Sequence, residues 1–175
     1  MLRTLHDADY REHVNLCEQQ FGLFDGIPDD ELPSRYPAES AHYAKCVAQG
    51  GKFWARMPLG ESRFDVAVRA HEAFGTFHRD AARRGIRRLA IICHGVTMRA
   101  IVMQWLHLPY EWFDAEANPR NGAIRHISDH EDLGYLGPDG AHDLPPNRHA
   151  HAPVARAKTA RAAQRPPSRA SARSR

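Results

Sequence analysis

The sequence is poor in cysteine and has no long hydrophobic run. Its 175 residues include three cysteines, Cys17, Cys46 and Cys93, an odd number at unrelated spacings. We therefore expect reduced thiols and a cytoplasmic protein rather than a disulfide framework. No run approaches the roughly eighteen apolar residues of a membrane helix, and the first residues do not resemble a signal peptide, so we expect no membrane partner.

Residues 148–175 lack Asp and Glu but contain eight Lys and Arg among Ala, Ser and Pro. The whole chain carries +3, so these eight charges leave residues 1–147 at −5. Such a segment cannot bury enough apolar surface to offset the entropy of ordering. We predict one domain over residues 1–137 and a disordered basic tail over 138–175. The tail is interpreted as a solvated extension, with weak nucleic-acid contact as the alternative.

Helical and strand patterns alternate in the middle of the chain, which is typical of an α/β sandwich. Ser62 and Asp65 resemble a capping box for a helix that continues to Gly85. The remaining expected elements are a brief helix within 28–35, helices at 38–49, 97–106 and 109–113, strands at 89–93 and 123–127, and a weak strand after 131.

His94 follows an apolar run of strand length, Leu89–Cys93, and precedes Gly95 and a helical pattern. Open α/β sheets bind ligands at the carboxyl ends of their strands, so His94 is a candidate site residue. Side chains alternate across a strand, so Cys93 and His94 are not expected to form a nucleophilic dyad.

Two other histidines, His71 and His78, are seven residues apart on the expected helix 62–85. No carboxylate or cysteine completes a metal-ligand set with them, so we interpret them as structural. We expect neither a metal ion nor an organic cofactor.

Four motifs in order resemble those of the histidine phosphatase superfamily, specifically its phosphoglycerate-mutase-like branch. They are "LCEQQFG" (L-x-E-x-x-F-G), "GESRFDVAVR" (G-E-S-x-x-D-V-x-x-R), "IICHG" with a following arginine, and "NPRN" (N-x-x-N) before a strand. The resemblance covers residues 16–127 and implies a three-layer α/β sandwich of the phosphoglycerate mutase type. It also implies a phosphorylated small molecule as substrate.

The resemblance implies roles for individual residues. Glu18 occupies the position of the proton donor that protonates the leaving oxygen of a phosphate ester. His94 corresponds to the second family histidine, which contacts the phosphoryl group, with Gly95 beside it. Glu61 resembles a position at the mouth of the pocket, although a carboxylate favoured at a helix start explains it equally well.

Arg99 and Asn121 also match positions in the family motifs, with less distinct roles. The family nucleophile, a histidine in R-H-G at the end of the first strand, has no counterpart in this sequence. Its two Arg-His steps, Arg125-His126 and Arg148-His149, are not followed by glycine.

We therefore expect an incomplete domain without its first strand and following segment, and no phosphatase turnover by this chain alone. Without a nucleophilic imidazole no phosphohistidine forms, and without paired arginines the phosphate loses its bidentate clamp. The main alternative is a non-catalytic pseudophosphatase that binds a phosphorylated ligand or a protein partner. The sequence leaves substrate identity and oligomeric state open.

Overall fold

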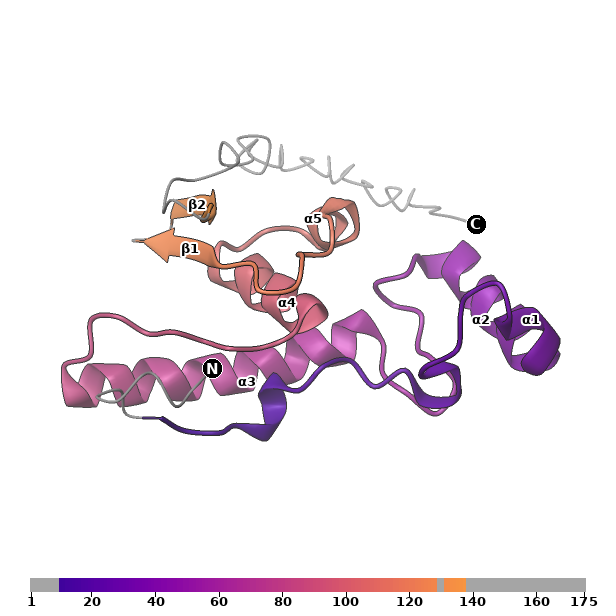
Figure 1. Cartoon of the computed structure of the whole chain (residues 1–175), viewed down its shortest axis with the longest axis horizontal. Coiled ribbons are helices and arrows are strands. Elements are labelled where there is room, and N and C mark those ends of the chain that lie inside the picture. Colours follow the sequence, from indigo (N-terminus) through magenta and orange to yellow (C-terminus); the bar gives the residue numbers. More distant parts are fainter. Residues whose placement is uncertain (1–9, 129–130, 138–175) are drawn as a thin grey trace, which may run out of the picture.

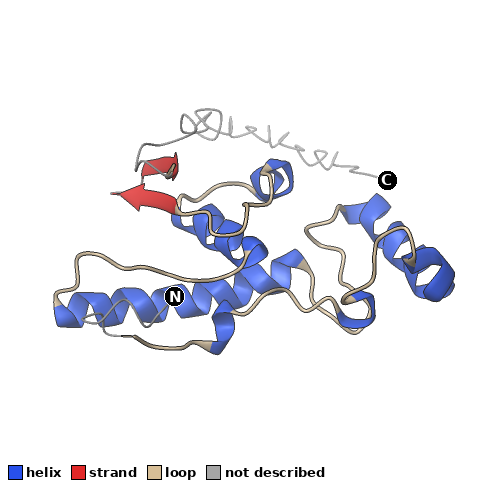
Figure 2. Ribbon diagram, in the orientation of Figure 1, coloured by secondary structure: helices blue, strands red, loops and turns tan. Residues whose placement is uncertain are grey.

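The structure is a computed structural model, and it describes residues 10–128 and 131–137. Helices dominate the described part, with one two-stranded sheet beside them (Figure 2). The helices are α1 (Leu32–Arg35), α2 (Pro37–Gly50), α3 (Arg63–Arg84), α4 (Gly95–Trp105) and α5 (Tyr110–Ala115), with short 3-10 helices at Val14–Leu16 and Gly22–Phe24. The strands β1 (Arg125–Ser128) and β2 (Glu131–Tyr135) pair antiparallel, with an irregularity between His126 and Ile127.

The long helix α3 begins and ends as the sequence predicts. The Ser62 hydroxyl accepts from the backbone N–H of Asp65, and the Asp65 carboxylate accepts from the backbone N–H of Ser62, which completes the capping box. At the other end Gly85 adopts φ +65°, a left-handed conformation that favours glycine, and its N–H caps the last turn. Local chemistry therefore sets both ends of α3.

The core lies where α3, α4 and α5 meet. The face of α3 toward α4 carries small or β-branched buried side chains, Val66, Ala67, Ala70 and Ala73, which allow the two helices to approach closely. Phe113 of α5 and Ala100 of α4 are fully buried in the same cluster. α1 and α2 lie to one side of this core in Figure 1.

The predicted strand Leu89–Cys93 is not a strand in the structure. It runs as a single segment from α3 back to α4, and the backbone hydrogen bonds of the described residues include none that joins it to a strand (Figure 1). Ile91 and Cys93 pack against the core, whereas Leu89 is 53% exposed and Ile92 62% exposed. Residues 89–93 are mostly apolar, as expected, but a β-strand also needs a neighbouring strand with which to form backbone hydrogen bonds.

Other boundaries differ slightly from expectation. Pro109 is the N-cap of α5 rather than a residue of its first turn, and β1 begins at Arg125, after a turn that includes Gly122. The mixed helix-and-sheet class is as predicted, but the expected sandwich shows only part of its sheet. The tail that we predict to be disordered, 138–175, lies outside the described residues.

A membrane-crossing helix would need a length and an apolar character that no helix of the described part combines.

The unpaired segment Leu89–Cys93 generates a prediction for the purified chain. Exposed apolar residues next to unpaired backbone groups promote edge-to-edge association, so we expect the chain to self-associate. Ile92→Lys places a charge on the exposed face of the segment and should shift the population toward monomer in light scattering after gel filtration. Val14→Lys, at a residue that is 79% exposed elsewhere, is the matched control and should change nothing. A monodisperse monomer before any substitution contradicts this expectation.

Candidate functional site

Glu18 lies in an irregular segment that α3 holds in place through Arg69. The Arg69 guanidinium donates to the backbone carbonyls of Asn15, Cys17 and Glu18 at 2.8, 2.9 and 3.0 Å. Three carbonyls from four consecutive residues are thus fixed by one side chain. The backbone that carries the Glu18 carboxylate is therefore anchored to the middle of the molecule.

Glu61 completes this arrangement from the other side of Arg69. Its two carboxylate oxygens accept from Arg69 Nε at 2.9 Å and Nη2 at 3.0 Å, and one of them accepts from the backbone N–H of Gln20. Partial burial raises the pKa of Glu61, but the Arg69 and Gln20 hydrogen bonds and the Arg69 charge outweigh it and hold the pKa below its ordinary value. In this structure Glu61 braces the Glu18 segment rather than standing free at a pocket mouth.

His94 is the N-cap residue of α4, and its imidazole is exposed. Three residues further on, the Thr97 hydroxyl donates to the Cys17 carbonyl at 2.8 Å, which ties the residue before Glu18 to the first turn of α4. Burial, together with the negative charge of Glu18, raises the pKa of the Cys93 thiol to about 11. The segment that carries Glu18 therefore lies at the N-terminal end of α4, where His94 is found.

The raised pKa of Cys93 limits the chemistry that Cys93 and its neighbour His94 can perform. A thiol with so high a pKa stays protonated at neutral pH and is a poor nucleophile. Cys93 packs against the core while the His94 side chain is exposed, which agrees with the expectation that they form no dyad.

Gly95 lies close to side chains of the loop that follows α5. A Cβ atom at this position would lie 2.9 Å from Oδ1 of Asn118 and 3.3 Å from Cδ of Pro119. A larger residue here would require the Asn118 side chain to shift, whereas glycine accommodates the loop that follows α5 as it lies. The Asn118 side chain therefore lies beside the His94–Gly95 step.

The two less distinct candidates lie elsewhere. Arg99 is buried, donates to the carbonyls of Phe113 and Glu116, and stacks 4.5 Å from the centre of the Phe113 ring. Burial lowers the pKa of its guanidinium from the ordinary value. Arg99 thus holds the end of α5, and the structure does not bring it to Glu18. Asn121 is exposed in the turn before β1.

The two helical histidines have protein partners. Nδ1 of His71 lies 2.6 Å from the Gln104 side-chain oxygen, and the His78 ring stacks on Trp105 at 4.6 Å. Across residues 10–128 and 131–137, no three His, Cys, Asp or Glu side chains gather in a way that could hold a metal ion.

Arg69 and Thr97, which were not predicted as site residues, hold the backbone beside the candidate residues Glu18 and His94. Arg69 is the last residue of the G-E-S-x-x-D-V-x-x-R pattern, so the signal was present without a role attached to it. Thr97 gave no sequence signal, because its partner is a backbone carbonyl eighty residues away in the chain.

The family model described as histidine phosphatase superfamily (branch 1) matches residues 2–135. A curated relative, the phosphoglycerate mutase-like protein AT74 of Arabidopsis thaliana, is 30% identical over 122 residues, which are 66% of this chain and 35% of the relative. The chain thus spans about a third of the length of this relative.

Solved structures share the fold at low identity. Mycobacterial hydrolase 1 matches with a TM-score of 0.52 and 22% identity over 66% of this chain and 55% of its own. A mycobacterial glucosyl-3-phosphoglycerate phosphatase, solved with inorganic phosphate, matches with a TM-score of 0.51 and 22% identity over 66% of this chain and 57% of its own. The chain spans a little over half of each.

Removal of the Arg69 guanidinium should destabilise the fold. Arg69→Met removes the opposite charge beside Glu61 and five guanidinium hydrogen bonds, two to Glu61 and three to backbone carbonyls, in a site where the two charged side chains are 14% and 17% exposed. The Glu61 carboxylate then keeps only the Gln20 N–H. We expect a loss of about 2–4 kcal/mol in the free energy of unfolding, measured with urea at dilute protein. Arg56→Met is the control, because the Arg56 side chain is 65% exposed and pairs only at the surface with Asp65. It should cost less than about 1 kcal/mol. Equal losses in the two variants would show that Arg69 is not the anchor.

Stability should also fall in acid through Glu61. Its pKa is lower in the folded than in the unfolded chain, so its contribution is present above the ordinary glutamate pKa of about 4.3 and is lost as pH falls through the folded value. The urea midpoint should therefore drop between pH 6 and pH 3 by more in the unaltered chain than in Glu61→Gln. Glu111→Gln, at an exposed carboxylate, should keep the full drop. Parallel profiles for all three proteins would exclude this role of Glu61.

Proposed function

We propose, since this chain belongs to the histidine phosphatase superfamily (branch 1), that it provides the acid and the phosphate-contacting histidine of a phosphomonoester-cleaving site. Glu18 is the acid and His94, with Gly95, contacts the phosphoryl group. The nucleophilic imidazole lies outside this sequence, which contains no R-H-G.

The proposal rests mainly on one hydrogen bond between distant parts of the chain. The Thr97 hydroxyl, 2.8 Å from the Cys17 carbonyl, links the first turn after His94 to the residue before Glu18. Two candidate residues 76 positions apart in sequence are thereby drawn to one end of α4. The effect of the Glu18 charge on Cys93, the neighbour of His94, supports the same arrangement.

The two side chains divide the chemistry between them. The phosphoryl group passes to the nucleophilic imidazole, and its bond to the ester oxygen breaks. Because an alkoxide is a poor leaving group, Glu18 donates its proton to that oxygen. His94 lies against the phosphoryl oxygens and stabilises the charge that develops on them. The amino end of α4, whose N-cap side chain makes no capping hydrogen bond, favours an anion at the same point.

The substrate class follows from the relatives. One solved relative is a phosphatase of glucosyl-3-phosphoglycerate and holds inorganic phosphate, and the curated relative is named for its likeness to phosphoglycerate mutase. Both names point to small phosphorylated metabolites. We therefore propose a phosphorylated small molecule as the substrate of the complete protein.

The test compares this chain with the same reading frame extended upstream of Met1. The extended protein should contain an R-H-G strand and hydrolyse para-nitrophenyl phosphate, whereas this chain alone should give no turnover. In the extended protein Glu18→Ala and His94→Ala should each lower kcat by about 100-fold or more.

Glu111→Ala removes an exposed carboxylate of α5 and is the matched control, expected to stay within about twofold of the unaltered protein. Turnover by this chain alone that disappears in Glu18→Ala or His94→Ala would contradict the proposal that the nucleophile lies outside this sequence. An upstream frame without R-H-G would favour the non-catalytic alternative.

A further inference from the structure

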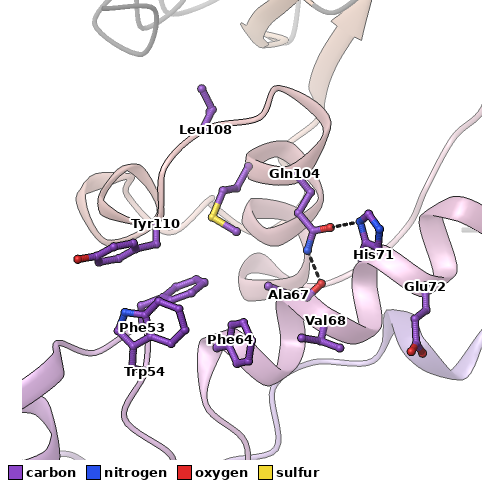
Figure 3. A pocket seen from close by; sticks show the side chains of 11 residues that line it. Phe53, Trp54, Phe64, Ala67, Val68, His71, Glu72, Gln104, Leu108 and Tyr110 are labelled. Atoms are coloured by element: carbon purple, nitrogen blue, oxygen red, sulfur yellow. Dashed lines mark hydrogen bonds between the residues drawn. The ribbon is translucent and has the colours of Figure 1, made fainter. Parts of the chain in front are cut away.

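A groove on the opposite side of α3 from the Glu18 segment has no part in the proposed reaction. It lies between α3 and the α4–α5 connection and encloses about 410 Å³ (Figure 3). Its wall is largely aromatic at one end, where Phe53, Trp54, Phe64 and Tyr110 gather, and the Glu72 carboxylate lies at the other end.

The aromatic end is a preformed platform. Trp54, Phe64 and Tyr110 are 46%, 42% and 41% exposed, although each packs on the others or on buried Phe53. The Trp54 ring centre lies 4.9 Å from that of Phe64 and 5.5 Å from that of Tyr110. Neighbouring exposed rings of this kind mark docking surfaces rather than ordinary solvent-facing positions.

The groove favours a segment with positive charge, because its lining carries a carboxylate and no cationic side chain of Lys or Arg. This one carboxylate is that of Glu72. Residues 1–147 as a whole carry −5. A segment that combines rings or prolines with positive charge would suit both ends of the groove.

We propose that this groove binds the chain's own basic tail, through the sequence Arg165-Pro166-Pro167-Ser168-Arg169. Adjacent prolines favour the polyproline II conformation, which docks in aromatic-lined grooves with little loss of entropy. Their rings would lie on Trp54 and Tyr110, while the flanking guanidinium groups stack on ring faces or pair with Glu72. Residues 148–175 carry eight positive charges and no negative one, so no tail charge opposes this contact.

The length of the chain permits this contact. The last described residue is Gly137, and 27 residues lie between it and Arg165. A chain of that length can span up to about 90 Å, several times the size of a small domain. Because the tail is tethered, its effective concentration at the groove is of millimolar order, so contacts that are weak between separate molecules suffice.

The test uses the full chain with a photo-crosslinker in the tail. Ser168→p-benzoylphenylalanine is introduced together with Ile92→Lys, which should suppress association through residues 89–93. The protein is illuminated at submicromolar concentration, and crosslinked peptides are identified by mass spectrometry. The adducts should lie within one polypeptide, on the segments that carry Trp54, Phe64 or Tyr110. Their yield should fall about fivefold or more in Trp54→Ala/Tyr110→Ala, because the rings that hold the prolines and arginines are gone.

Trp54→Phe/Tyr110→Phe keeps both rings and is the matched control, expected to retain most of the yield. Glu72→Gln, at an exposed helical position where misfolding is not expected, should lower the yield about threefold and remove its dependence on salt. Adducts between two polypeptides would assign the groove to a second copy and overturn the proposal. Adducts scattered over the surface, or unaffected by loss of the rings, would overturn it as well.

Discussion

The arrangement of the candidate site depends on one guanidinium group. Arg69 projects from the first half of α3, pairs through two nitrogens with Glu61, and donates to three carbonyls of the segment that ends at Glu18. That segment has no regular secondary structure between its short 3-10 helices, so its backbone carbonyls depend on side-chain donors. A planar group with five donors is suited to this task, and lysine could not replace it.

Thr97 extends this anchor to the other candidate residue. Its hydroxyl binds the Cys17 carbonyl, which Arg69 also binds, so the start of α4 and the first half of α3 hold the same peptide unit. The loop after α5 then crosses at Gly95. His94 is exposed and Glu18 is partly buried, as are Arg69 and Glu61, whereas Thr97 is fully buried. The opposite face of α3 carries none of these groups and borders the aromatic groove that we propose as a docking site.

The structural features that the sequence predicted correctly are those with local causes. The capping box at Ser62 and Asp65 and the left-handed Gly85 define α3 because each acts within one turn of the helix. The strand Leu89–Cys93 was predicted wrongly, since its apolar run needs a neighbouring strand that no local pattern provides. The roles of Arg69 and Thr97 were not predicted for a similar reason, because each donates hydrogen bonds to backbone carbonyls at least fifty residues away in the chain. The motifs supplied the candidate residues Glu18 and His94, but not the hydrogen bonds through which Arg69 and Thr97 hold the backbone beside them.

The most direct test is a crystal structure of the upstream-extended protein grown with inorganic phosphate. The account predicts a phosphate ion at the amino end of α4, in contact with the His94 imidazole and on the side where the Glu18 carboxylate lies. Glu18 on the far side of α4 from His94, or phosphate bound elsewhere while this end stays empty, would contradict it.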